Sequence, residues 1–120
     1  MFRVTHFEVP ADDPERAVAF YNKVFDWKIE KWEGPVEYWL VMTGEGEPGI
    51  NGGVARRGSV SVTTNTIEVP SVDEFSQKIV QSGGKVVMPK MAIPGVGYMA
   101  YCVDTEGNLF GIMHADTAAQ

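Results

Sequence analysis

The sequence contains one segment twice, as Thr5-His6-Phe7-Glu8-Val9-Pro10-Ala11-Asp12-Asp13 and as Asn65-Thr66-Ile67-Glu68-Val69-Pro70-Ser71-Val72-Asp73. The copies begin at residues 5 and 65, so they lie 60 residues apart, half the length of the 120-residue chain. Each copy alternates polar and apolar residues and closes on Val-Pro. This pattern predicts a half-buried strand that ends at a residue unable to donate a ladder hydrogen bond. The repeat therefore predicts two modules of the same topology.

An amphipathic helix is expected after each of these strands. Asp13-Pro14-Glu15 has the residue types of an N-cap, a first helical position and a first-turn acid, and this helix should run to about Phe25. Ser71-Val72-Asp73-Glu74 has the spacing of a capping box, and Ser82-Gly83-Gly84 supplies the stop. The stripe of the first helix that should face the sheet is Ala17, Phe20, Tyr21, Val24 and Phe25.

Three extended runs follow each helix and complete a βαβββ order in both halves. They cover residues 27–33, 38–42 and 50–56 in the first half, and 85–91, 98–103 and 109–114 in the second. We expect one α+β domain over residues 1–120, with modules of about 1–57 and 60–114. With a helix on the outside of each module, the predicted architecture is a curled eight-stranded sheet around a central cavity, which is the natural ligand site.

Composition excludes several classes of protein. Hydrophobic residues at 44% and charged residues at 22% are typical of a folded domain. A net charge of −6 opposes nucleic acid as a partner, because affinity for phosphates requires clustered Lys and Arg. The single cysteine, Cys102, excludes an internal disulfide and a cysteine-built zinc cage. No apolar run has the length of a membrane span and no signal peptide is evident, so we expect a cytoplasmic protein without a membrane partner.

Several of these features together resemble the vicinal oxygen chelate superfamily, which includes glyoxalase I, bleomycin-resistance proteins, fosfomycin-resistance enzymes and extradiol dioxygenases. The resemblance rests on the tandem modules, Thr5-His6-Phe7, Asp13-Pro14 with Phe20-Tyr21, and the closing turn Asp104-Thr105-Glu106-Gly107-Asn108-Leu109-Phe110. Asp26 stands where many relatives carry Gly, and Asp tolerates the left-handed conformation better than most residues. The resemblance also implies a homodimer.

Metal enzymes of this superfamily hold a divalent ion with side chains from strands one, four, five and eight. The resemblance places His6 at the first of these positions, Thr66 where relatives usually have His, and Gly111 where they have Glu. The fourth strand offers Asn51, Gly52 and Gly53 in an unresolved register. A stable divalent site needs at least three good donors, so we expect neither a bound metal nor another cofactor. This counts against glyoxalase, thiol-transfer and ring-cleavage chemistry.

The leading hypothesis is a metal-independent protein of the glyoxalase/bleomycin-resistance type that binds a small organic molecule. Aromatic and methionine side chains are numerous on the strands around the expected cavity, and they suit an apolar or planar ligand. The opposing interpretation places half of them in the core and the rest in a dimer interface. The predicted ligand contacts are His6, Trp39, Asn51, Thr66 and Tyr101.

A second hypothesis is a lyase or isomerase, with His6 and either Glu8 or Glu68 as acid–base groups. If Phe7 and Val9 pack under a helix, strand alternation turns His6 and Glu8 the other way. A metal site relocated to these residues belongs to the same hypothesis. Two alternatives remain open: the carboxylates reach solvent at the rim, and His6 is a structural residue bonded to a neighbour. A third hypothesis is a subunit or regulatory partner that binds no ligand.

Overall fold

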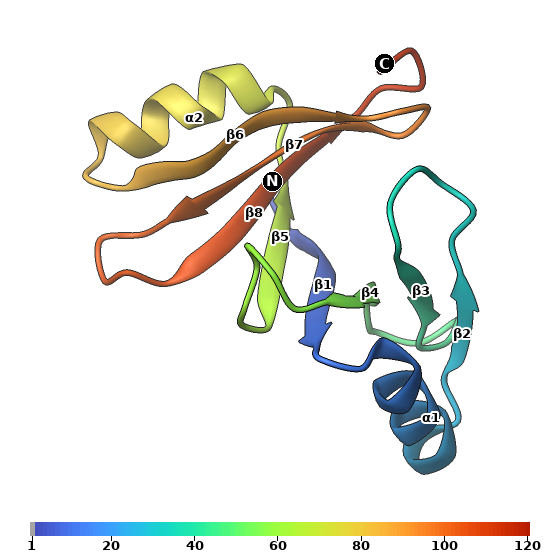
Figure 1. Ribbon diagram of the computed structural model, residues 1–120. Coiled ribbons are helices and arrows are strands. Elements are labelled where there is room, and N and C mark those ends of the chain that lie inside the picture. Colours follow the sequence, from blue (N-terminus) through green and yellow to red (C-terminus); the bar gives the residue numbers. More distant parts are fainter. Residues whose placement is uncertain (1) are drawn as a thin grey trace. The chain divides into compact units, whose positions relative to one another are not determined.

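The computed structural model describes residues 2–120, which contain two helices and eight strands (Figure 1). The first half has β1 (Val4–Ala11), α1 (Pro14–Phe25), β2 (Lys28–Lys31), β3 (Trp39–Met42) and β4 (Asn51–Arg56). The second half has β5 (Thr64–Glu68), α2 (Val72–Gln81), β6 (Lys85–Ile93), β7 (Gly97–Val103) and β8 (Leu109–Ala115). Both halves therefore have the predicted βαβββ order.

The strands of the first half are ordered β2-β3-β4-β1 and those of the second half β5-β8-β7-β6, and each set contains both parallel and antiparallel pairs. The pairs β1–β4 and β5–β8 are parallel, because the chain passes through a helix and two strands before it returns beside its starting strand. The other pairs within each half are antiparallel. The predicted α+β class and strand number are confirmed.

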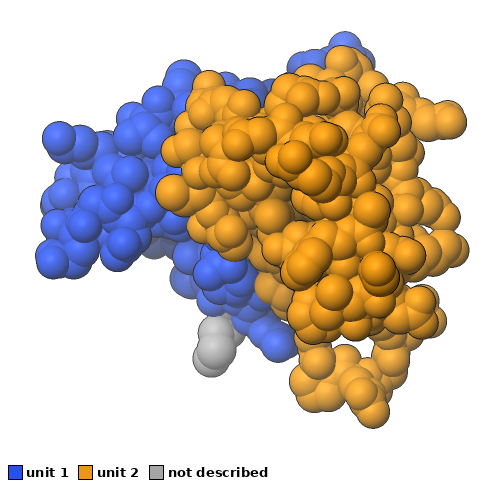
Figure 2. All heavy atoms as spheres, turned by 60° about the horizontal axis from the view of Figure 1, so that its bottom comes forward, with its two compact units in different colours: residues 1–4, 65–120 blue, residues 5–64 orange. Residues whose placement is uncertain are grey.

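The chain divides into two compact units (Figure 2). Unit 1 contains residues 2–4 and 65–120, and unit 2 contains residues 5–64. Residues 57–61 belong to unit 2, and Arg57 forms hydrogen bonds within that unit. Its backbone N–H donates to the Ala11 carbonyl (2.7 Å), and its guanidinium donates to Asp12 (2.9 Å) and to the Ser61 carbonyl (2.8 Å). The cavity expected between the two modules remains a prediction.

Unit 2 has its core between α1 and one face of its strands. The buried side chains are those of Ala11, Trp39, Val41 and Val54, and Phe7, Val9, Ala17 and Val18 pack against them. The register pairs Val9 with Val54 and Trp39 with Val54, so β1, β4 and β3 all contribute to this core.

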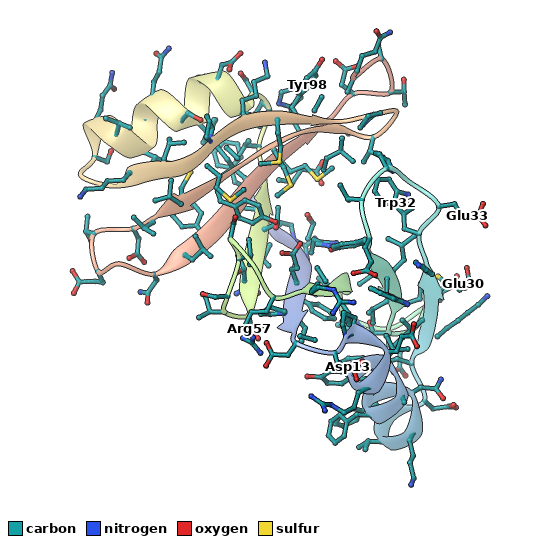
Figure 3. All side chains as sticks on the ribbon, in the orientation of Figure 1. Asp13, Glu30, Trp32, Glu33, Arg57 and Tyr98 are labelled. Carbon is teal, nitrogen blue, oxygen red and sulfur yellow. The ribbon has the colours of Figure 1, made fainter. Side chains whose placement is uncertain are left out.

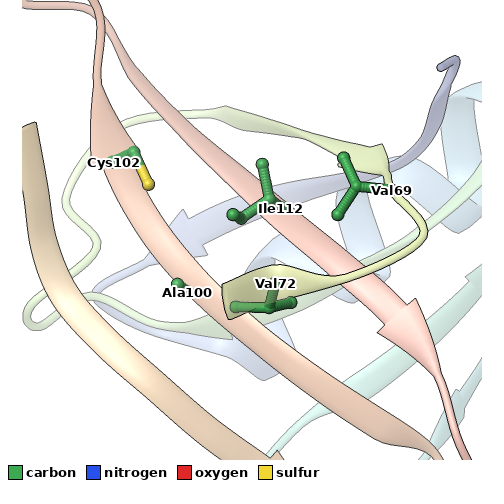
Figure 4. Close-up of a cluster of buried hydrophobic side chains, with 5 residues drawn as sticks. All are labelled: Val69, Val72, Ala100, Cys102 and Ile112. Carbon is green, nitrogen blue, oxygen red and sulfur yellow. The ribbon is translucent and has the colours of Figure 1, made fainter. Parts of the chain in front are cut away.

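Unit 1 has the same plan under α2. Its buried cluster consists of Val69, Val72, Ala100, Cys102 and Ile112 (Figure 4). Ala100 and Ile112 are paired across β7 and β8, and Phe75 and Ile79 of α2 pack against the cluster. Burial raises the pKa of the Cys102 thiol, which therefore stays protonated at neutral pH.

The helix ends match the sequence signals. The Asp13 side chain accepts a hydrogen bond from the Arg16 N–H (3.2 Å), and the Ser71 hydroxyl accepts one from the Glu74 N–H (3.1 Å). Asp26 ends α1 in the left-handed conformation with φ of 57°. Asp26 therefore takes the left-handed conformation that the sequence analysis expected of it.

The predicted stripe of α1 was wrong at three positions. Phe20, Val24 and Phe25 are 56%, 54% and 55% exposed, whereas Ala17 packs on the core as predicted, together with Val18. At Phe25 the cause is Trp27, which follows the helix and folds back on it. Its ring lies 5.2 Å from the Tyr21 ring and 5.4 Å from the Phe25 ring. For Phe25, stacking with Trp27 takes the place of the expected packing against the sheet.

Within residues 2–120, neither helix has the length and apolar character that a membrane span requires.

Candidate functional site

Each unit has one strand face covered by its own helix and one face turned away from it, called here the helix-free face. In β1, Phe7 and Val9 pack on the α1 side, so His6 and Glu8 lie on the helix-free face of unit 2. In β5, Ile67 packs on the α2 side, so Thr66 and Glu68 lie on the helix-free face of unit 1. The predicted alternation in both strands is confirmed.

His6 forms a side-chain pair with Tyr38, which precedes β3. The His6 Nε2 and Tyr38 Oη atoms are 2.8 Å apart, and the two rings are nearly parallel, with an interplanar angle of 18°. Both side chains are half-buried.

Gly53 makes this pair possible. It lies on β4 opposite Glu8, and a Cβ atom built on it would overlap the Oη, Cζ and Cε2 atoms of Tyr38. The phenol ring therefore lies directly on the β4 backbone, where only a residue without a side chain leaves room. Gly53 is buried, as expected for backbone covered by a ring.

Trp32 and Glu37 hold the segment that carries Tyr38. The N–H of Trp32, a residue labelled in Figure 3, donates to the Tyr38 carbonyl (2.8 Å). The two rings meet edge to face, with centroids 6.4 Å apart. Glu37 accepts a hydrogen bond from the Arg56 guanidinium (2.9 Å), which lowers the pKa of the Glu37 carboxyl. Tyr38 is thus held by the backbone hydrogen bond from Trp32 and by its sequence neighbour Glu37, which is bonded to Arg56.

Burial lowers the pKa of the His6 imidazole from its ordinary value of 6.5, because a half-buried site disfavours the charged ring. His6 is therefore neutral at pH 7. A neutral imidazole has one N–H donor and one lone pair, and a phenol can donate or accept. In either tautomer the pair offers a ligand both a hydrogen-bond donor and an acceptor.

The structure resolves the register of the fourth strand, because His6 is paired with Asn51. The Asn51 carbonyl oxygen Oδ1 accepts a hydrogen bond from the Thr43 N–H (2.9 Å), and the Thr43 hydroxyl donates to the Ile50 carbonyl (2.7 Å). The Asn51 amide is therefore used in part to hold the connection from β3 to β4.

Trp39 does not lie at the site. It is 6% exposed and belongs to the core under α1, so its prediction as a ligand contact is corrected. Neighbouring strand residues point to opposite faces, and Tyr38 takes the position on the His6 side. The alternation of Tyr38 and Trp39 was visible in the sequence. Which of the two faces the core depends on the pairing of β3 with β4, which the sequence does not show.

The other two predicted ligand contacts lie on the helix-free face of unit 1. Thr66 and Tyr101 are both paired with Gly111, one from each side, and both are buried. A Cβ atom on Gly111 would lie 2.8 Å from the Thr66 Oγ1 atom. The threonine hydroxyl therefore occupies space that a longer residue at 111 would need.

The two candidate carboxylates differ in their surroundings. Glu8 is half-buried and stands two residues from His6 on the same face of β1, whereas Glu68 is exposed. In residues 2–120, no group of three or more His, Cys, Asp or Glu side chains is placed to hold a metal ion.

His114 has a structural role at the far end of β8. Its Nδ1 atom accepts a hydrogen bond from the N–H of Val72, the first residue of α2 (2.9 Å), and its ring lies 5.3 Å from the Tyr98 ring. It thus satisfies one of the free N–H groups at the start of the helix.

Comparison with known proteins gives the same architecture. The described fold is that of two βαβββ units joined in one chain. The family model of the Glyoxalase/Bleomycin resistance protein/Dioxygenase superfamily matches residues 3–112. The chain belongs to this superfamily, as the sequence motifs predicted. No curated protein sequence matches it.

Solved structures with this fold include proteins of different activity. A hypothetical protein from Bacillus halodurans C-125 has a TM-score of 0.74 and 14% identity, over 99% of this chain and 98% of that one. A methylmalonyl-CoA epimerase from Mycobacterium tuberculosis has a TM-score of 0.69 and 10% identity, over 94% and 87%. A Mn(II)-bound glyoxalase from Novosphingobium aromaticivorans has a TM-score of 0.65 and 14% identity, over 93% and 37%. At these identities the similarity shows the fold alone.

Proposed function

We propose that the protein binds a small organic molecule without a metal ion, and that the His6–Tyr38 pair on unit 2 is its polar anchor. The observation that carries this proposal is the 2.8 Å hydrogen bond between the two side chains over Gly53. A neutral imidazole and a phenol provide directional contacts at a low cost in side-chain entropy, and the Trp32 ring beside them adds apolar surface.

The donor set supports a site that needs no metal. Unit 2 supplies one imidazole and an amide whose oxygen already accepts a backbone hydrogen bond, and unit 1 supplies a hydroxyl and a glycine at the matching positions. Divalent ions of the family type need more anionic or imidazole ligands than this set contains. Thr66 and Tyr101 remain proposed ligand contacts on unit 1, and the net charge of −6 favours neutral or cationic ligands.

Ligand binding is tested by thermal shift with a panel of antibiotics, including bleomycin, and aromatic metabolites. A compound that raises Tm is then titrated against wild type, His6→Ala and Tyr38→Phe. Tyr21→Phe is the matched control, because it removes the same hydroxyl from a ring that stacks on Trp27. We expect His6→Ala and Tyr38→Phe to weaken binding at least tenfold and the control to bind normally. Equal binding by all four proteins, or stoichiometric Zn, Ni, Mn or Fe in protein purified without chelators, contradicts the proposal.

A second function, proton transfer by a lyase or isomerase, is favoured by the state of His6. The lowered pKa keeps the His6 imidazole neutral at pH 7, so one ring nitrogen can accept a proton from a substrate. Tyr38 can supply or receive the proton at Nε2, the ring nitrogen that it contacts. Glu8, on the same strand face, is the nearest carboxylate along β1.

Exchange of an acidic C–H hydrogen in D2O separates the two functions. Methylmalonyl-CoA is a suitable probe, because its C2–H is acidified by two carbonyl groups. Exchange that is faster with wild type than with His6→Ala, followed by proton NMR, supports catalysis. Ligand binding without exchange leaves the binding function in place and rejects proton transfer from this class of substrate.

A further inference from the structure

Three methionines lie side by side on the helix-free face of unit 1. Met99 on β7 is paired with Met91 on β6 and with Met113 on β8. Ala100 and Ile112, their strand neighbours, belong to the core under α2, so Met99 and Met113 point to the other face. Directly paired residues on one face have Cβ atoms about 4.5–5.5 Å apart. The three thioether side chains, called here the methionine row, are therefore within reach of one another.

Two irregularities in β6 complete this arrangement. Val86 is paired with Cys102 and packs in the core, and regular alternation would turn Met88 the same way. Register shifts between Val86 and Met88, and between Met88 and Met91, instead pair Met88 with Tyr101 and Met91 with Met99. Four of the six methionines of the chain are thereby collected on one face of three neighbouring strands.

The chemistry of this row differs from that of the divalent site of the family. Thioether sulfur is a soft ligand, which selects soft cations such as Cu(I) and discriminates against Zn(II), Mn(II) and Mg(II). Methionine has three rotatable side-chain bonds, so adjacent sulfurs can turn toward one ion. All three side chains are half-buried, and Glu68, paired with Met113 at the end of the row, adds a negative charge.

We propose that Met91, Met99 and Met113 form a binding site for a soft monovalent cation, Cu(I) or Ag(I), on unit 1. The site uses none of the residues of the His6–Tyr38 pair, and it lies on the same helix-free face of unit 1 as the proposed ligand contacts Thr66 and Tyr101. The competing explanation is that methionine serves here only as a flexible apolar side chain. Leucine separates the two, because it is apolar and of similar volume but has no sulfur.

The test is titration of the full chain with Ag(I), which is stable in air, followed by NMR of methionine methyl groups labelled with carbon-13. We expect one equivalent of Ag(I) to shift the methyl signals of the row and to leave Met42, an exposed residue of β3, unchanged. Met99→Leu, which removes the central sulfur, should weaken binding at least tenfold, and Met42→Leu should bind as wild type does. Met113→Leu serves as a second variant if Met99→Leu does not fold.

Cys102 is a possible competing ligand, so the titration is repeated with Cys102→Ala. The thiol lies on the α2 side of β7, away from the row, and the methyl shifts should persist in this variant. The proposal is overturned if the row signals do not move, if Met42 moves equally, if the shifts disappear with Cys102→Ala, or if the leucine variants bind Ag(I) as tightly as wild type.

Discussion

Replacing Gly53 with alanine tests whether the Tyr38 ring is held against β4. The added Cβ atom would overlap the Tyr38 ring at distances that real Cβ atoms do not show. The backbone of Gly53 is not among those with positive φ, so alanine causes no strain of its own there. Any large cost must therefore come from displacement of the phenol.

The magnitude follows from what the displaced ring loses. The hydrogen bond to His6 contributes about 0.5–1.5 kcal/mol, and overpacking of a filled site costs about 1–3 kcal/mol. We expect Gly53→Ala to lower the free energy of unfolding by about 2–4 kcal/mol. In a Tyr38→Ala background the same change meets no ring, and it should raise stability by about 0.4–1 kcal/mol, because alanine restricts the unfolded chain.

The assay is urea unfolding of wild type, both single variants and the double variant, which together form a double-mutant cycle. Gly49→Ala is the matched control, because its backbone also lacks a positive φ and the nearest atom to an added Cβ is the Thr43 Oγ1, at 3.9 Å. If Gly53→Ala is as harmless as Gly49→Ala, or costs the same with and without the Tyr38 ring, the ring is not held as described.

Three further predictions concern pH, the core and a helix end. The lowered pKa of His6 means that the unfolded chain takes up a proton first as the pH falls below the ordinary value of 6.5, so wild type should lose stability there. His6→Gln should show a smaller loss in urea unfolding at several pH values, and an unchanged slope would show that His6 does not cause it. Ile112→Ala should lower the free energy of unfolding by about 2–5 kcal/mol, since its fully buried side chain leaves a cavity; a cost below that of a surface substitution would contradict the assigned core. Ser71→Ala should cost about 1 kcal/mol by removing the cap of α2, and an equal effect of Ser59→Ala, in the exposed loop after β4, would argue against capping.

Much of the fold could be predicted because its signals are local. Proline after a strand, an acid or serine at a helix start and glycine at a turn act within a few residues, and Asp13, Ser71 and Asp26 take the expected roles. The repeat supported each assignment a second time, because the same strand and helix signals occur again 60 residues later.

The site was predicted only in part. Alternation placed His6 on the correct face of its strand, but the predicted ligand contacts included Trp39 and not its neighbour Tyr38. The partner of His6 lies 32 residues away, and its position depends on the absence of a side chain at Gly53 on another strand. No window of sequence around either residue contains that information.

Residue type and spacing along the chain were enough for the superfamily, the βαβββ order and the helix ends, because each arises from interactions between near neighbours in sequence. Strand register and the shifts in β6 set which side chains meet across strands, including the His6–Tyr38 pair and the methionine row. A shift of one residue turns a side chain to the opposite face at little local cost, so only packing of the folded chain selects between the two arrangements.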